Sequence, residues 1–182
     1  GTRRAAGPIF PEIGLVEVLT QMKNHPHYKT PISGKYRGRG VAVGYWFNIG
    51  CESSVVISVN SDGTISLVEG STDIGGSRAS IAMQAAEVLG IKSEDVNPSV
   101  VDTDSIGFTF LTGGSRTTYA TGWAAYKAAE DVKEQMIARV AMIWEVDVSA
   151  VSFDSGIFTS MNSSNQSMSF KQLAGELPDT GG

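Results

Sequence analysis

Cysteine is almost missing from this sequence, and histidine is scarce. Cys51 is the single cysteine among 182 residues, so the chain alone forms no disulfide, zinc knuckle or iron–sulfur ligand set. We expect Cys51 to be a small buried apolar side chain. His25 and His27 flank Pro26 without a cysteine or carboxylate that would complete a metal site. We expect solvated loop histidines and no metal ligands within this chain.

An excess of basic residues is also absent. Lys and Arg total 14 against 19 Asp and Glu, which gives a net charge of −5. Nucleic acid needs a basic stripe, so we expect no nucleic-acid partner. No apolar run approaches the roughly 20 residues of a membrane span, and no signal-peptide core follows the first residues. We expect a soluble, cytoplasmic chain without a membrane span, with the periplasm left open as the alternative.

The length predicts a single globular domain with a real hydrophobic core. Within it we assign residues 1–34 to an N-terminal helix and connecting segment, and 35–182 to the main body. Polar stretches containing Gly and Pro at 1–11 and 178–182, and a first residue other than Met, predict a piece of something longer. Proteolysis or expression of a fragment would leave the same ends.

The spacing of apolar residues predicts hairpins that alternate with helices. Strand patterns occur over 39–49, 55–59, 64–68, 100–101, 148–153 and 157–159. Helical patterns run from Pro11 to about Asn24, over 81–89, over 125–143, and from Ser169 to Leu173. Asp62-Gly63 is the strongest hairpin signal, because this pair favours a tight turn. The predicted fold class is α+β, with helices packed on one side of a mixed sheet of hairpins.

The tetrapeptide Gly-Gly-Ser-Arg occurs at 75–78 and again at 113–116, each time just before a predicted helix. Glycines let the backbone approach a ligand, and the unpaired N–H groups of a helix N-terminus favour a phosphate. Serine adds a hydroxyl donor, and arginine adds a charged fork that suits phosphate. The loops therefore predict an anion site. Neither has the third glycine of the Rossmann fingerprint or the closing Gly-Lys-Ser/Thr of a P-loop.

Other catalytic chemistry has little support. Neither Ser77 nor Ser115 has a histidine in a pattern that suggests a Ser-His-Asp triad. Asp73, Asp102 and Asp104 would suit a magnesium ion, but aspartates in turns more commonly bond to their own backbone. We assign no catalytic residue in this chain.

Longer stretches surround both glycine loops. They are Ser71-Thr-Asp-Ile-Gly-Gly-Ser-Arg-Ala-Ser80 with Glu87-Val-Leu-Gly-Ile91, and Asp102-Thr-Asp104, Thr112-Gly-Gly-Ser-Arg-Thr-Thr118 and Thr121-Gly-Trp-Ala-Ala125. Both resemble the molybdopterin-binding large subunit of the xanthine dehydrogenase and aldehyde oxidase family, the molybdenum hydroxylases. The similarity begins near Lys35 and continues to the end of the long helix, with order and spacing kept.

The resemblance implies a fragment of a molybdenum hydroxylase large subunit, with residues 35–182 as part of its molybdopterin-binding domain. It implies an enzyme that hydroxylates an aldehyde or N-heterocycle, a small-molecule substrate, with oxygen from water. Molybdopterin is the implied cofactor, and its cytosine dinucleotide form stays open. The implied partners are the remainder of the large subunit and the domains or subunits that carry iron–sulfur clusters and FAD. The isolated fragment is predicted to be inactive.

Matching positions in the family motifs assign residues to the cofactor. Gly75, Gly76 and Ser77 would approach the pterin near the metal, and Gly113, Gly114, Ser115, Arg116, Thr117 and Thr118 would line the pyrophosphate and pterin.

The first loop departs from the family pattern, which usually reads Gly-Gln-Gly. Here Gly76 and Ser77 stand in the Gln and Gly places. The family's earlier glycine-rich loop and its catalytic glutamate are also missing, and Glu176 follows the long helix too closely to take that role. Two alternatives stay open: a stand-alone phosphate- or nucleotide-binding module, and a degenerate, non-catalytic family member.

Overall fold

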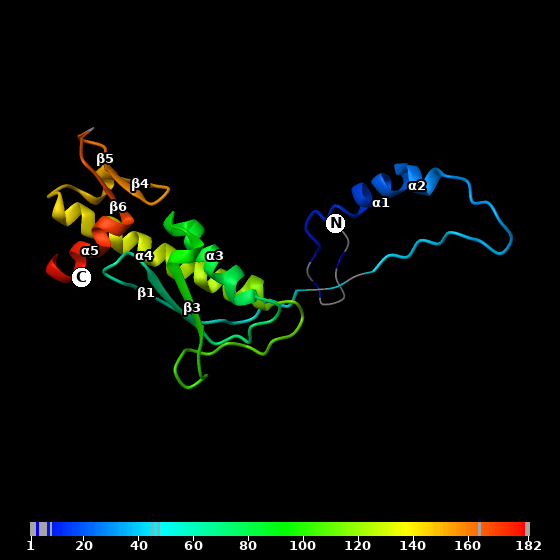
Figure 1. Cartoon of the computed structure of the whole chain (residues 1–182), viewed down its shortest axis with the longest axis horizontal. Coiled ribbons are helices and arrows are strands. Elements are labelled where there is room, and N and C mark those ends of the chain that lie inside the picture. Colours follow the sequence, from blue (N-terminus) through cyan, green and yellow to red (C-terminus); the bar gives the residue numbers. More distant parts are fainter. Residues whose placement is uncertain are drawn as a thin grey trace. The chain divides into compact units, whose positions relative to one another are not determined.

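The chain divides into two compact units, Gly1–Tyr45 and Trp46–Gly182. The computed structural model describes residues 3, 7, 9–44, 46, 48–163 and 165–180 (Figure 1). The domain boundary drawn from the sequence between residues 34 and 35 stays a prediction.

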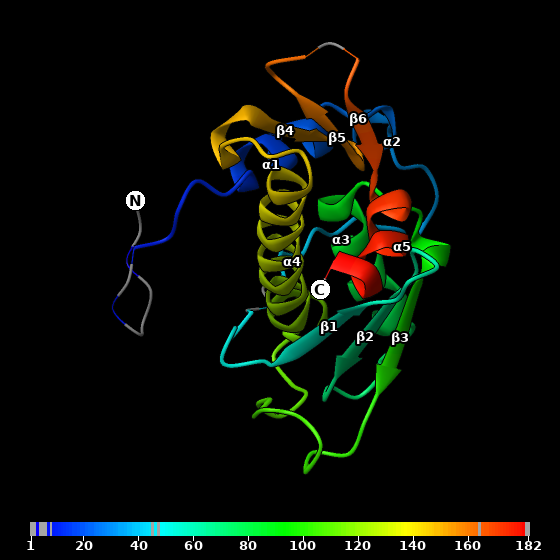
Figure 2. The same ribbon diagram turned by 90° about the vertical axis from the view of Figure 1, so that its left-hand side faces the viewer.

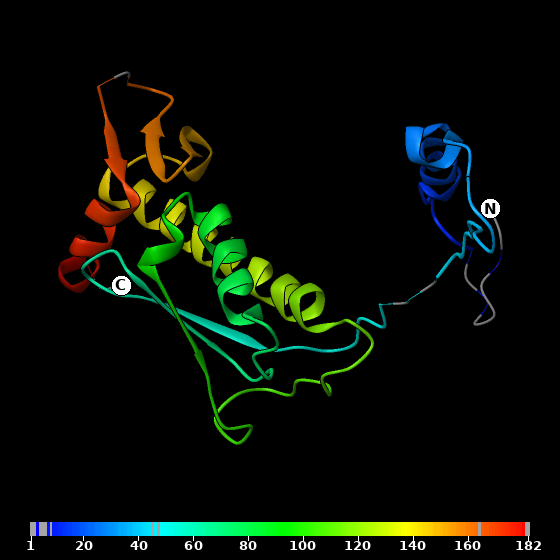
Figure 3. The same cartoon turned by 45° about the vertical axis from the view of Figure 1, so that its right-hand side comes forward.

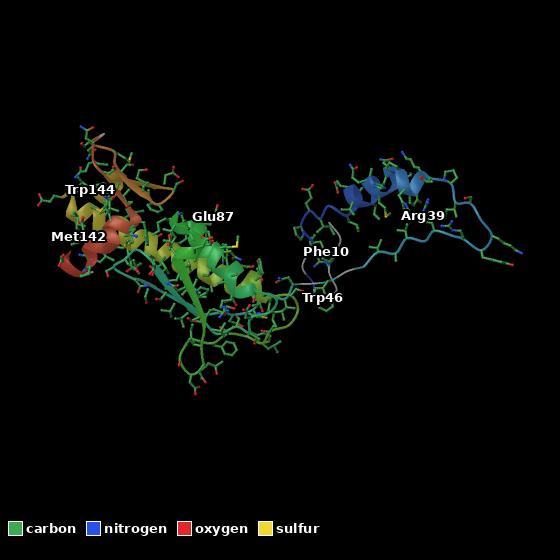
Figure 4. The ribbon with its side chains drawn as sticks, viewed as in Figure 1. Phe10, Arg39, Trp46, Glu87, Met142 and Trp144 are labelled. Carbon is green, nitrogen blue, oxygen red and sulfur yellow. The ribbon has the colours of Figure 1, made fainter. Side chains whose placement is uncertain are left out.

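The first unit contains α1 (Leu15–Asn24) and the single turn α2 (Pro26–Lys29). Helix α1 confirms the amphipathic pattern that follows Pro11. His25 and His27 are both exposed, as expected, although His27 lies within α2 rather than in a loop. Arg39 (Figure 4) donates hydrogen bonds to the carbonyls of Tyr28 and Thr30.

The strand predicted over 39–49 is wrong for the residues described there, which are irregular. Tyr45 and Phe47, which belong to the pattern, lie outside the described residues. An extended segment needs a neighbouring strand for its N–H and C=O groups, and none pairs with this segment in the described part of the chain. Gly40 and Gly44 further weaken a strand, because glycine has no side chain to pack.

The second unit begins with a mixed sheet of β1 (Val55–Val59), β2 (Ile65–Glu69) and β3 (Val96–Val100). Strand β2 is central, antiparallel to β1 and parallel to β3. The hairpin signal at Asp62-Gly63 is confirmed: Asp62 Oδ1 accepts the Thr64 N–H at 2.9 Å within the turn.

Helices α3 (Ser77–Leu89) and α4 (Gly122–Ile143) lie on the same side of this sheet (Figures 2 and 3). They pack against each other, α3 contacts β3, and α4 contacts β1. The two helices bury several alanines in the core, namely Ala82, Ala85, Ala86, Ala125 and Ala129. Small side chains allow helices to approach closely. The α+β class, with helices on one side of a mixed sheet, is therefore confirmed.

The chain ends in an antiparallel sheet of β4 (Val151–Asp154), β5 (Ile157–Ser160) and β6 (Ser167–Ser169), followed by α5 (Phe170–Thr180). The hairpin predicted from the strand patterns over 148–153 and 157–159 is confirmed, although residues 148–150 form a 3-10 turn before β4. Strand β6 was not predicted.

Helix α5 begins as predicted but ends later. Ser169 caps it, since Ser169 Oγ accepts the Gln172 N–H at 3.2 Å. The predicted end at Leu173 is wrong, because the helix continues through Pro178 to Thr180. Leu173 is buried and Leu177 packs against the core, so the apolar face stabilises the additional turns.

Among the described residues, no helix is both long enough and apolar enough to cross a membrane.

Candidate functional site

The structure brings both Gly-Gly-Ser-Arg loops to the wall of one cavity of about 360 Å³. Ile74 and Ser77 line it from the first loop. The second loop contributes Thr112, Gly113, Ser115, Arg116, Thr117 and Thr118. Of the residues assigned from the sequence, Gly75, Gly76 and Gly114 are not in the lining. Ile74 and Thr112 are additions that the sequence did not mark as site residues.

The second loop has an unusual backbone path into α4. It follows the long segment that returns from β3 (Figure 3). Gly114 and Ser115 have φ angles of 60° and 55°, and a π-helical turn (Thr117–Thr121) precedes α4. A Cβ atom added to Gly114 would lie 2.5 Å from Ile49 Cγ2, so this position requires glycine. Left-handed residues next to helical ones form concave arrays of N–H groups that bind anions, and π-turns are frequent at functional sites.

The backbone N–H groups of residues 113–118 have no hydrogen-bond acceptor in the part of the chain that the structure describes. Thr117 adds a hydroxyl: its Oγ1 is buried and also lacks a partner among the described residues. A buried polar atom without a partner costs about 1–3 kcal/mol, so such atoms point to a missing ligand. The donor set suits an oxygen-rich anion such as a phosphate.

The first loop is closed by its own chain. The N–H groups of the first turn of α3 bond to the carbonyls of Ile74 and Gly76 and to the Asp73 carboxylate. Asp73 Oδ2 also lies 3.5 Å from Arg78 Nε. The carboxylate therefore holds the place that an anion would take at this helix N-terminus. Although their letters are identical, the loops are not equivalent anion sites.

Arg116 lies beneath the second loop with 0% of its surface exposed. Its Nε donates to Gly50 O at 2.5 Å, its Nη1 to Phe110 O at 2.7 Å, and its Nη2 to Ser53 Oγ at 2.7 Å. Its Nη1 also bonds to the Leu111 carbonyl, and its Nη2 to the carbonyls of Cys51 and Glu52. All three guanidinium nitrogens have acceptors, so the direct phosphate contact predicted for this fork has no free N–H group to make it. Arg116 borders the cavity and supports the loop.

Cys51 is exposed, so the prediction of a buried cysteine is wrong. Its φ of 68° belongs to a segment whose carbonyls point at Arg116. Directing the carbonyls inward leaves the Cys51 side chain outside.

The aspartates behave as turn residues. Asp102 Oδ1 accepts the Asp104 N–H at 2.9 Å, which confirms the backbone-bonding interpretation. The residues that the structure describes contain no group of three or more His, Cys, Asp or Glu that could hold a metal ion.

A family model described as the molybdopterin cofactor-binding domain matches residues 18–180. The chain belongs to this family. The resemblance read from the glycine loops is thus confirmed at the level of the molybdopterin-binding domain.

Solved structures agree with this assignment. The chain is 25% identical to Cu,Mo-CO dehydrogenase in its carbon monoxide reduced state, with a TM-score of 0.64, and the match covers 69% of this chain and 16% of that one. Reconstituted CO dehydrogenase from Oligotropha carboxidovorans gives the same values. Quinoline 2-oxidoreductase from Pseudomonas putida 86 shares the fold at 20% identity, with a TM-score of 0.61 and the same coverages.

The molybdopterin-binding domain described here therefore spans only 16% of the length of these solved chains. A comparison with curated proteins found no significant match.

Glu69, at the end of β2, is a buried acid near the first glycine loop. It was not predicted from the sequence. It is 0% exposed, its Oε2 accepts the Ser71 N–H at 2.6 Å, and its Oε1 has no partner among the described residues. Burial raises the pKa of Glu69 and outweighs the hydrogen bonds from Ser71, which lower it. One signal was available: Ile65 and Leu67 share the inward face of β2, where a charged residue is unexpected.

Replacing Arg116 with Ala is expected to destabilise the fold by about 3 kcal/mol or more, because several buried carbonyls would lose their donor at about 1–3 kcal/mol each. Arg78→Ala is the matched control from the other tetrapeptide. Its side chain is 49% exposed, so a loss below about 1 kcal/mol is expected. Urea unfolding measures both variants, and equal losses would contradict the supporting role of Arg116.

Glu69→Gln is expected to change how stability depends on pH. The native pKa of Glu69 is raised, so the native state binds the proton more tightly than the unfolded state. Its contribution to the free energy of unfolding therefore falls as pH rises from the unfolded pKa of about 4.3 to the native value. Glutamine does not ionise and removes this fall.

The measurement for this second prediction is urea unfolding of both proteins from about pH 4 to about pH 8. Hydrogen bonds from Thr64 and Ser149 lower the pKa values of Asp62 and Asp147, whose stabilisation is lost as pH falls. These aspartates are present in both proteins and cancel in the comparison. If the free energy of unfolding depends on pH in the same way in both proteins, the raised pKa of Glu69 is refuted.

Proposed function

We propose that the chain supplies one part of the molybdopterin site in the large subunit of a molybdenum hydroxylase. The observation that carries this proposal is the run of N–H groups at 113–118 beside the cavity, which have no acceptor among the described residues. Membership of the molybdopterin-binding family supports the identity of the ligand. A pterin with a phosphate or pyrophosphate tail presents many acceptor atoms, which this donor-rich wall matches.

The residues of the second loop would hold the tail and the pterin through their backbone N–H groups, with the Thr117 hydroxyl as an additional donor. Ser77 would border the same ligand from the first loop. We retain Gly75 and Gly76 as candidates for the metal end of the pterin, because an added Cβ at either position meets no atom within 4 Å. Arg116 would act beneath the loop, holding its backbone in the binding conformation.

When bound, the molybdenum cofactor would supply oxidative hydroxylation of an aldehyde or N-heterocycle with oxygen from water, as in the xanthine dehydrogenase and aldehyde oxidase class. The chain would bind and orient this cofactor, whether in the molybdopterin or the cytosine dinucleotide form. The remaining large subunit would supply the catalytic base and the substrate pocket. Partner domains or subunits with iron–sulfur clusters and FAD would carry the electrons, in an enzyme of the cytoplasm.

Analysis of the metal and cofactor bound to the purified whole enzyme tests this function. Molybdenum together with a pterin fluorophore in the purified protein supports the proposal. A preparation free of molybdenum that binds nucleotide tightly would instead favour the stand-alone nucleotide module.

Thr117→Val is expected to lower molybdopterin affinity by about tenfold, because one hydrogen bond to a charged ligand contributes about 1.5–3 kcal/mol. Stability without cofactor should stay the same or rise, since the change removes a buried hydroxyl that has no partner among the described residues. Pterin content and thermal unfolding measure the two effects. Thr159→Val is the control, because Thr159 is an exposed residue of β5 and does not line the cavity. Unchanged pterin content in Thr117→Val would remove Thr117 from the site.

Gly76→Gln tests whether the site is degenerate at the first loop. The position has open space but a φ of 87°, which costs an ordinary residue about 1–2 kcal/mol. Gly76→Ala carries the same strain without the amide and is the matched control. If a missing glutamine contact weakens the site, the Gln variant should retain more cofactor than the Ala variant. Equal retention would point to a different binding mode at this loop.

A further inference from the structure

A series of hydrogen bonds connects two buried ionisable groups, Arg116 and Glu69, through serine and threonine hydroxyls and the backbone N–H of Ser71. Arg116 Nη2 donates to Ser53 Oγ at 2.7 Å, and Ser53 Oγ lies 2.9 Å from Thr121 Oγ1. Thr121 Oγ1 is 2.5 Å from Ser71 Oγ, and the Ser71 N–H donates to Glu69 at 2.6 Å. We call these five residues the Arg116–Glu69 relay.

The donors of the relay favour one direction. A guanidinium only donates, so Ser53 Oγ accepts at that end and keeps its own proton for Thr121. Thr121 can then donate to Ser71 Oγ, and the backbone N–H of Ser71 donates to the Glu69 carboxyl group. The bonds from Arg116 to Ser71 Oγ, aligned in this way, polarise and strengthen one another in a buried environment. Glu69 is the acceptor at which the series ends.

The relay joins segments that are far apart in the sequence. Ser53 precedes β1, Ser71 follows β2, and Thr121 ends the π-helical turn whose first residue is Thr117. Arg116, Glu69, Thr121 and Ser71 are all almost fully buried. Fold stability alone gives no reason for an acid at the end of β2, because Ile65 and Leu67 occupy the same inward face.

We propose that Glu69 is a positioning residue for the molybdopterin loop, and that it acts through Ser71, Thr121, Ser53 and Arg116. The relay fixes Thr121 at one end of the π-helical turn and Arg116 at the other. The N–H groups of 113–118 and the Thr117 hydroxyl, which have no partner within the described part of the chain, are thereby held in one arrangement before the cofactor arrives. This role rests on the proposed function, whereas the relay itself is a property of the fold.

The test uses the whole enzyme with Glu69→Met, Thr121→Val and the double variant. Urea unfolding of the cofactor-free forms measures the coupling between the two positions. Groups in one hydrogen-bonded network couple, so the double variant should depart from additivity by at least about fivefold in the unfolding equilibrium constant. Additive losses would overturn the relay.

Molybdopterin content, measured on folded protein, tests the positioning role. Each single variant should reduce retention by about tenfold, the effect typical of residues that orient a ligand-binding group, and the double variant should be no worse. Thr121→Ser keeps the hydroxyl and should restore retention. Leu67→Ala, from the same face of β2, controls for lost stability and should retain cofactor when folded.

Coupling without loss of cofactor in the single variants would overturn the positioning role while leaving the relay. Loss of cofactor in Leu67→Ala equal to that in Glu69→Met would also overturn it, since instability alone would then explain the effect. A wild-type enzyme without molybdopterin would instead overturn the proposed function, and with it the positioning role. Urea unfolding of the single and double variants would still decide whether the relay exists.

Discussion

The buried guanidinium of Arg116 joins two irregular segments that have no regular structure of their own to fix them. Its donors reach carbonyls between Gly50 and Glu52 on one segment and that of Phe110 on the other. Carbonyls that face inward need a donor, and a planar group with five N–H bonds satisfies several of them from one place. Arg116 belongs to the second glycine loop, and the N–H groups of this loop have no acceptor among the described residues.

The identical tetrapeptides show how context decides the role of a motif. At the first copy, Asp73 bonds to the start of α3 and pairs with Arg78, so the helix N-terminus is already neutralised. At the second copy no carboxylate plays that part among the described residues, and a π-helical turn replaces the ordinary helix start. Both arginines precede helices, but one is exposed and the other is wholly buried.

Local signals predicted much of the fold. The Asp62-Gly63 turn, the start of α5 at Ser169 and the apolar face of α4 follow from short-range rules of turns, caps and periodicity. The segment over 39–49 has a strand pattern, yet no strand pairs with it among the described residues, and pairing is not a local property. The prediction that Cys51 is buried was wrong for a related reason. The position of its side chain depends on carbonyls that bond to Arg116, far along the chain.

The candidate site was predictable as a set of loops but not as a geometry. The sequence placed Ser77, Gly113 and Thr117 near one ligand, and the structure places all three in one cavity wall. The sequence could not show that the Arg116 N–H groups are already bonded to carbonyls, because a sequence gives a charge but not its partners. Glu69 was visible only as an acid on an apolar strand face, and its connection to Arg116 passes through residues from three separate segments.

The most direct test of this account is a structure of the whole enzyme with its cofactor bound. We predict that acceptor atoms of the pterin or its phosphate tail lie about 2.7–3.2 Å from backbone nitrogens within 113–118, while Arg116 keeps its bonds to the carbonyls. A cofactor whose phosphate instead contacts the guanidinium of Arg116, or the N-terminus of α3 at Ser77 with the second loop empty, would contradict it.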